Sequence, residues 1–204
     1  MNTFLPHMLA GLGLGFSLII AIGVQNIFVL RQGIRGEHVL PVVLVCALSD
    51  AALILLGVTG LGVIIERAPL LITIIRWAGA AFLLTYAVLA ARRVFTANSL
   101  DVTTEGKSAG LGATVLAVLA LTWLNPHVYL DTVLLLGSIA NTHGIDGRWW
   151  FAVGAVLASV IWFTALGYGA RLLRPLFAKP IAWRVLDAII AVVMLVLGVK
   201  LVLP

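Results

Sequence analysis

The chain has 204 residues, of which 62% are hydrophobic and only 10% are charged, and its mean hydropathy is +1.16. Soluble domains carry a much smaller apolar share and a much larger charged share, so the composition excludes a soluble protein and predicts an integral membrane protein surrounded by lipids. The net charge of +5 does not indicate a nucleic-acid partner, because basic residues of a membrane protein mark its cytoplasmic loops.

Six apolar runs are long enough to cross a bilayer, which takes about 20 helical residues. In chain order they cover Leu5 to Leu30, Val39 to Ile65, Leu70 to Val94, Leu111 to Gly137, Trp149 to Ala170 and Trp183 to Leu203. Arg76 interrupts the first half of the third run, so a five-span protein with one interfacial piece is the alternative. The favoured prediction is an all-α polytopic membrane protein with six transmembrane helices.

The longest polar stretch separates the first three runs from the last three. It is too short for a soluble domain and is expected to be a linker, residues 96–110, between three-helix halves at 1–95 and 111–204. Together the halves are expected to form a single transmembrane domain. The first run has no basic residue before it and exceeds a normal signal-peptide core, so we expect the N-terminus to be retained.

The distribution of basic residues predicts an orientation. Nine lie in one set of loops, namely Arg31, Arg35, Arg92, Arg93, Lys107, Arg171, Arg174, Lys179 and Arg184. Four lie on the other side, namely Arg67, Arg76, Arg148 and Lys200. The richer side is expected to be cytoplasmic, which places the linker inside and both termini outside.

Enzymatic and redox functions find little support in the motifs. The only cysteine, Cys46, allows neither a disulfide nor a paired-thiol redox centre. The chain has no HExxH motif and no serine nucleophile with a partner histidine. We therefore expect a protein that is not an enzyme, with no cofactor, no catalytic residue and no bound metal.

Two carboxylates, Asp50 and Asp131, fall more than five residues inside the ends of their apolar runs. Burial of a carboxylate in a membrane costs at least a few kcal/mol, and such residues usually face a cavity that carries ions, protons or substrate. A carboxylate that only ties helices together is the alternative for each. The pair indicates a path for a polar solute.

Two apolar runs also contain helix-disturbing residues. Asn125-Pro126 removes one helical N–H in mid-span, and Gly23, Gln25 and Asn26 interrupt the first run. Each run begins one half, and the two runs cross in opposite directions. Interrupted helices at corresponding positions favour two three-helix inverted repeats with a site at their interface, although plain kinks would also explain them.

Glycines in the apolar runs allow helices to approach closely. They include Gly11, Gly15, Gly57 and Gly79. The sequence leaves open whether these glycines pack helices within one chain or between two copies in a homodimer.

Four segments resemble the LysE/ArgO family of bacterial lysine and arginine exporters. They are IGVQNIFVLRQGI (22–34), VCALSD (45–50), TWLNPHVYLDT (122–132) and IIAVVMLVLGVKL (189–201). The resemblance implies export of L-lysine or L-arginine from the cytoplasm of a bacterium, across its plasma membrane, driven by the proton gradient. Val24 stands where the family usually has proline, which puts breakage of the first helix in doubt.

A basic amino acid needs groups of both polarities around it. Substrate-binding candidates are Gln25, Asn26, Asn125, Pro126, Tyr129 and Asp131. Asp50 and Asp131 are candidates for proton coupling, with Asp131 favoured for substrate contact and Asp50 for the proton. Export of a divalent metal through Asp50, Asp131 and His127 is an alternative, as is a membrane subunit without transport activity.

Overall fold

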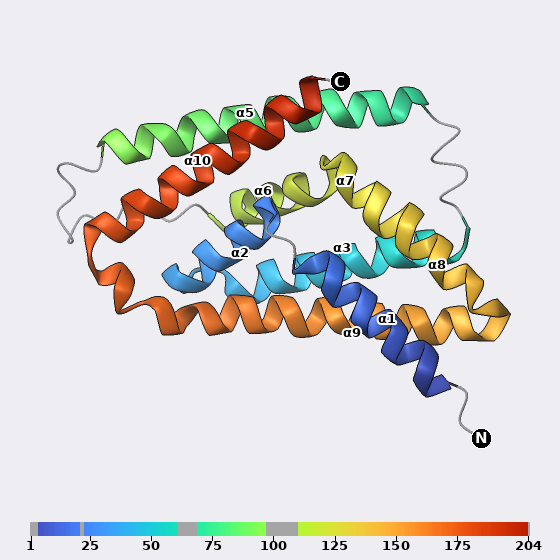
Figure 1. Ribbon diagram of the computed structural model, residues 1–204. Coiled ribbons are helices and arrows are strands. Elements are labelled where there is room, and N and C mark those ends of the chain that lie inside the picture. Colours follow the sequence, from blue (N-terminus) through green and yellow to red (C-terminus); the bar gives the residue numbers. More distant parts are fainter. Residues whose placement is uncertain (1–3, 21–22, 61–68, 97–109, 204) are drawn as a thin grey trace.

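The computed structural model describes residues 4–20, 23–60, 69–96 and 110–203, and every regular element in these ranges is helical (Figure 1). Most of the predicted linker 96–110, the end of the second apolar run, Arg67 and Lys107 lie outside the described residues. The prediction of an all-α protein is confirmed for the described ranges.

The elements follow one another as helices of very different length. They are α1 (Phe4–Ile19), α2 (Val24–Arg35), α3 (Val39–Val58), α5 (Pro69–Thr96), α6 (Leu111–Trp123), α7 (Pro126–Val128), the π-helix η1 (Tyr129–Leu136), α8 (Gly137–Thr142), α9 (Gly144–Gly169), the 3-10 helices η2 (Ala170–Leu173) and η3 (Leu176–Ala178), and α10 (Pro180–Val202).

Four helical segments within the described residues, in α3, α5, α9 with η2, and α10, are long and apolar enough to cross a membrane by themselves. Two further spans result if each bent pair is counted as one, and these pairs are α1 with α2, bent by 84°, and α6 with the helix from Pro126 to Thr142, bent by 58°. The protein is thus a multi-pass membrane protein with four to six spans. Arg76 does not interrupt α5, which is continuous over 28 residues.

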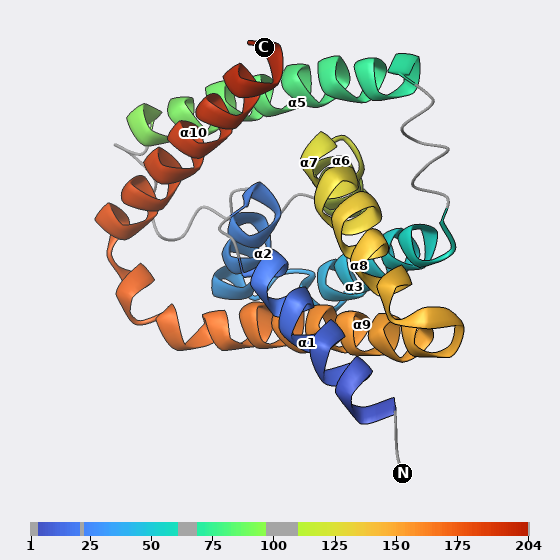
Figure 2. The same cartoon turned by 45° about the vertical axis from the view of Figure 1, so that its right-hand side comes forward.

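The helices form a body and a separate pair. α1 and α3 pack against α9, whereas α5 and α10 lie side by side in antiparallel directions, with α6 and α7 between them and the body (Figures 1 and 2). The main core joins the two parts, because buried residues of α2 and α3 share it with Leu83 on α5 and Met194 on α10. The outer faces of α5 and α10 expose apolar side chains suited to lipid.

Glycines place helix backbones in direct contact within the chain. A Cβ on Gly11 would collide with the backbone of Phe151 on α9, and one on Gly57 of α3 would lie 2.6 Å from the carbonyl oxygen of Val133 and 3.1 Å from Gly137 Cα. A Cβ on Gly79 of α5 would collide with the carbonyl oxygen of Leu124. These glycines therefore act in packing within one chain.

Alanine at Gly57 is expected to destabilise the protein by roughly 1–3 kcal/mol, because α3 and η1 must separate to admit the methyl group. Gly13 is the matched control, since a Cβ there would meet nothing within 4 Å. Thermal unfolding in detergent should show a lower midpoint for Gly57→Ala and almost no change for Gly13→Ala. Equal midpoints for the two variants would contradict the packing role of Gly57.

Candidate functional site

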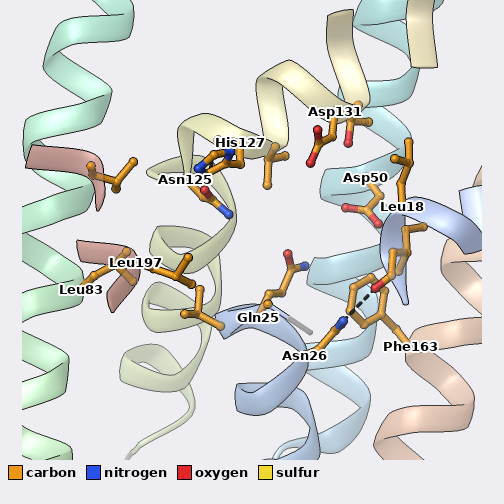
Figure 3. Close-up of a pocket in the computed structure, with 16 residues that line it drawn as sticks. Leu18, Gln25, Asn26, Asp50, Leu83, Asn125, His127, Asp131, Phe163 and Leu197 are labelled. Atoms are coloured by element: carbon orange, nitrogen blue, oxygen red, sulfur yellow. Dashed lines mark hydrogen bonds between the residues drawn. The ribbon is translucent and has the colours of Figure 1, made fainter. Parts of the chain in front are cut away.

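A cavity of about 210 Å³ lies between the two broken helices (Figure 3). Its lining residues come from both halves of the chain and are Leu18, Ile19, Gly23, Val24, Gln25, Asn26, Asp50, Leu83, Asn125, His127, Val128, Asp131, Thr132, Phe163, Leu197 and Leu201. The cavity is smaller than the roughly 300–1,000 Å³ of sites for drug-sized ligands, so it suits a small solute.

The first break separates α1 from α2 and does not require proline. Gly23 precedes α2 in an extended conformation, with φ −108° and ψ 168°. Asn26 Nδ2 donates a 2.8 Å hydrogen bond to the carbonyl oxygen of Ile19 near the end of α1, drawn as a dashed line in Figure 3. The Nε1 of Trp162 on α9 donates to Asn26 Oδ1 at 3.2 Å. Asn26 therefore satisfies a carbonyl at the helix end, and the helix breaks although Val24 replaces proline.

Replacement of Asn26 by alanine is expected to destabilise the protein by about 1–3 kcal/mol, because a partly buried carbonyl and the Trp162 N–H would both lose a partner. Gln25→Ala is the matched control, since Gln25 lines the same cavity without bridging the break. Thermal unfolding should separate the two variants, with a clear loss for Asn26→Ala alone. Similar midpoints would show that Asn26 does not hold the break.

The second break separates α6 from α7 at Leu124 and Asn125. The Asn125 side chain accepts a 3.2 Å hydrogen bond from the backbone N–H of His127, and Pro126 occupies the first helical turn, where its missing N–H costs nothing. The Tyr129 hydroxyl donates to the carbonyl oxygen of Trp123 at 2.9 Å. Tyr129 and Pro126 thus shape the break and are not among the residues that line the cavity.

The helix after the second break is wound as a π-helix from Tyr129 to Leu136. π-Helical turns are rare and often occur at functional sites. This turn carries Asp131, which is exposed and lines the cavity. The wide turn therefore presents a carboxylate to the cavity from the broken helix of the second half.

Asp50 approaches the cavity from α3 and is only 8% exposed. Its Oδ2 accepts a 2.7 Å hydrogen bond from the hydroxyl of Ser159 on α9. The carboxylates of Asp50 and Asp131 and the amides of Gln25 and Asn125 point into the same space in Figure 3. Among the described residues, the buried Nε2 of Gln25 has no hydrogen-bond partner, which leaves a donor for a bound solute.

The structure brings together five of the seven residues predicted to form the site, namely Gln25, Asn26, Asp50, Asn125 and Asp131. Sequence reasoning missed Ser159 and Trp162 on α9, which hold Asp50 and Asn26. These two residues are one helical turn apart in an apolar helix, and that spacing was the available signal. The apolar wall of Leu83, Leu197 and Leu201 carries no signal, because any membrane helix contains such residues.

The part of the chain that the structure describes contains no cluster of side chains suited to bind a metal ion. No group of three or more His, Cys, Asp or Glu side chains is placed to hold an ion within ranges 4–20, 23–60, 69–96 and 110–203. His127, Asp50 and Asp131 all line the cavity, but they are not placed to bind one ion together.

A multi-pass helical protein with carboxylates and amides in a cavity between two broken helices has the construction of a membrane transporter of small solutes. The family described as LysE type translocator matches residues 16–204. The chain belongs to this LysE family, and it is a transporter rather than an enzyme.

Several curated relatives cover most of the chain. A Mycobacterium tuberculosis protein whose name provisionally assigns it to amino-acid transport is 50% identical over 179 residues, 88% of each chain. The arginine exporter protein ArgO of Serratia proteamaculans is 43% identical over 190 residues, 93% of each chain. The lysine exporter LysE of Corynebacterium glutamicum is 37% identical over 228 aligned positions, covering 96% of this chain and 97% of the relative. No solved structure matches the chain.

Proposed function

We propose that the protein exports L-lysine, L-arginine or both from the bacterial cytoplasm by exchange for protons. The observation that carries this proposal is the meeting of Asp50, Asp131, Gln25 and Asn125 in one small cavity. The names of the relatives, which include lysine and arginine exporters, support the choice of cargo and of the bacterial plasma membrane.

The cavity offers complementary groups for each part of a basic amino acid. In the proposal the Asp131 carboxylate contacts the cationic side chain, since a charge-assisted hydrogen bond is the strongest contact available there. Gln25 and Asn125 bind the backbone groups of the substrate. α2 begins at the cavity with Gly23 as its N-cap and no side-chain cap, and its positive end suits the substrate carboxylate.

Exchange for a proton removes the electrical cost of exporting a cation. A cation that leaves against an inside-negative potential costs about 2.3 kcal/mol per 100 mV. One proton entering for each cation leaving cancels this cost and leaves the pH gradient as the driving force. Asp50 is the proposed proton carrier, because it is nearly buried beside the cavity and is held by Ser159.

We further propose that residues 1–95 and 111–204 are inverted repeats, with α1 and α2 corresponding to α6 and the helix that follows it. Both lead helices are broken at a polar motif that lines the cavity, which supports the correspondence. The proposed orientation has both termini outside and the linker 96–110 inside. Hydrogen bonds join Arg31 on α2 and Arg93 on α5 to Asp187 on α10, and Arg174 after η2 to α2, which supports the placement of these helix ends on one side.

Uptake of labelled arginine and lysine into inverted membrane vesicles tests the function directly. The cytoplasmic face of such vesicles is outside, so export appears as uptake. We expect saturable accumulation of at least one of the two when the vesicle interior is made acidic, and loss of accumulation when an ionophore dissipates the gradient. Absence of gradient-dependent accumulation of both amino acids would overturn the proposal.

A further inference from the structure

A second charged cluster lies away from the cavity, where α2, α5 and α10 meet. Arg31 Nη1 on α2 donates a 2.8 Å hydrogen bond to Asp187 Oδ1 on α10, and Arg93 Nε on α5 donates to the same oxygen at 3.2 Å. The side chains of Arg31 and Asp187 are only 10% and 9% exposed. The cluster ties the α5 and α10 pair to the body of the protein.

The two arginines hold the carboxylate unequally. Arg93 makes the longer contact, its side chain is 37% exposed, and its ring partner Tyr86 lies 5.6 Å from the guanidinium carbon. Both arginines donate to the same oxygen, Oδ1. Arg93 is the weaker partner, because its contact is longer and its side chain is more exposed.

The charge of the cluster decides how a further cation could bind. Two arginines and one aspartate sum to one positive charge, so a third cation added to the cluster would be repelled at short range. A cation that replaces Arg93 leaves the sum unchanged, because Arg93 can move its charge into solvent. Electrostatics therefore allow a cation to bind Asp187 only if it displaces Arg93.

The same three helices lead from the cluster to the cavity. By helical rise, Arg31 lies about 9 Å beyond Gln25 on α2, and Arg93 lies about 15 Å beyond Leu83 on α5. On α10, Asp187 lies about 15 Å before the cavity residue Leu197 by the same rise. Buried core residues of these helices, including Phe28, Ala90 and Met194, fill the space between the cluster and the cavity, so a solute could pass there only if α5 and α10 separate from α2.

We propose that Asp187 is the entrance residue that selects cationic substrates: the side chain of a cytoplasmic basic amino acid takes the place of Arg93 on Asp187 and thereby releases α5 and α10 from α2. This inference rests on the proposed function and orientation and adds a second recognition step to them. A neutral amino acid of the same size cannot replace Arg93, so it leaves the entrance closed.

The transport test compares Arg93→Gln with Arg92→Gln, a control that removes the same charge one residue away. Arg93→Gln keeps the buried Arg31 and Asp187 pair and removes only the competitor of the substrate. In inverted vesicles we expect it to lower the KM for arginine several-fold with little change in maximal rate, and Arg92→Gln to leave both values near those of the parent. Equal KM values for the two variants would overturn the inference.

The carboxylate itself is tested by Asp187→Asn and Asp187→Glu. Asparagine is expected to raise the KM for arginine at least about tenfold, and glutamate is expected to restore most of the affinity. Unfolding of Asp187→Asn would not affect the comparison at Arg93, where the buried ion pair is retained. A normal KM in folded Asp187→Asn would contradict the entrance role.

A labelling test is independent of transport. The background is Cys46→Ala with Leu197→Cys as a reporter in the cavity, treated with a membrane-impermeant thiol reagent on the cytoplasmic face. Arg93→Gln is expected to speed labelling several-fold, whereas Arg92→Gln is not. Unchanged labelling in Arg93→Gln would refute the entrance role of Asp187, even if arginine export is established. Failure of the parent protein to transport arginine or lysine would instead refute the proposed function.

Discussion

Asp131→Asn is expected to abolish measurable export while the protein still inserts and folds. Asp131 lines the cavity from the π-helical turn and is the proposed contact for the cationic side chain. Loss of a charge-assisted hydrogen bond costs about 1.5–3 kcal/mol, which corresponds to roughly 10- to 150-fold weaker binding. Asparagine keeps the shape of the side chain and is easier to place in a membrane, so insertion is not impaired.

The measurement is uptake of labelled arginine and lysine into inverted vesicles, normalised to the amount of folded protein. Asp146→Asn is the matched control, because Asp146 lies in the first turn of α9 and does not line the cavity. Export by Asp131→Asn at nearly the rate of Asp146→Asn would refute the assignment of Asp131 to the substrate.

Asp50→Asn is expected to uncouple transport from the pH gradient. For exchange of one proton per substrate, a gradient of one pH unit supports about tenfold accumulation. A permanently neutral side chain cannot carry the proton, so accumulation should fall to the level without a gradient. Exchange of labelled for unlabelled arginine across the membrane should continue, because it requires no net proton movement.

Ser159→Ala is the companion variant, since the Ser159 hydroxyl is the hydrogen-bond donor to Asp50 Oδ2. It keeps the titratable carboxylate and is expected to retain coupling at a reduced rate. If Asp50→Asn still accumulates arginine in proportion to the pH gradient, the proton carrier is another group. If it loses exchange as well as accumulation, Asp50 acts in substrate binding instead.

The cavity residues illustrate how far sequence reasoning reaches. Asp50 and Asp131 were predictable as residues that face a cavity, because a carboxylate in an apolar run is costly and rarely faces lipid. The division of labour among the amides was not predictable. Gln25 keeps a buried donor without a partner among the described residues, whereas Asn26 holds Ile19 and Trp162, and only their three-dimensional surroundings distinguish these adjacent residues.

The break between α1 and α2 was also not predictable from the local sequence. The sequence contains Gly23 and Asn26 but lacks the family proline, and backbone rules alone leave breakage there undecided. At the break, the Asn26 amide accepts a hydrogen bond from Trp162, which is 136 residues away in the chain. Similarly, nothing in the local sequence of Asp187 indicates that Arg31 and Arg93, from two other helices, meet its carboxylate.

The sequence by itself determined that the protein lies in a membrane, that it is helical, and which polar residues fall within its apolar runs. Backbone groups in lipid must be hydrogen-bonded internally, so membrane helices have a characteristic composition and length. Only the tertiary structure decided which polar groups share a cavity, which brace a helix break, and which pair with one another. These outcomes depend on contacts between distant helices, and van der Waals packing at glycines such as Gly57 and Gly137 sets those contacts without a periodic pattern in the chain.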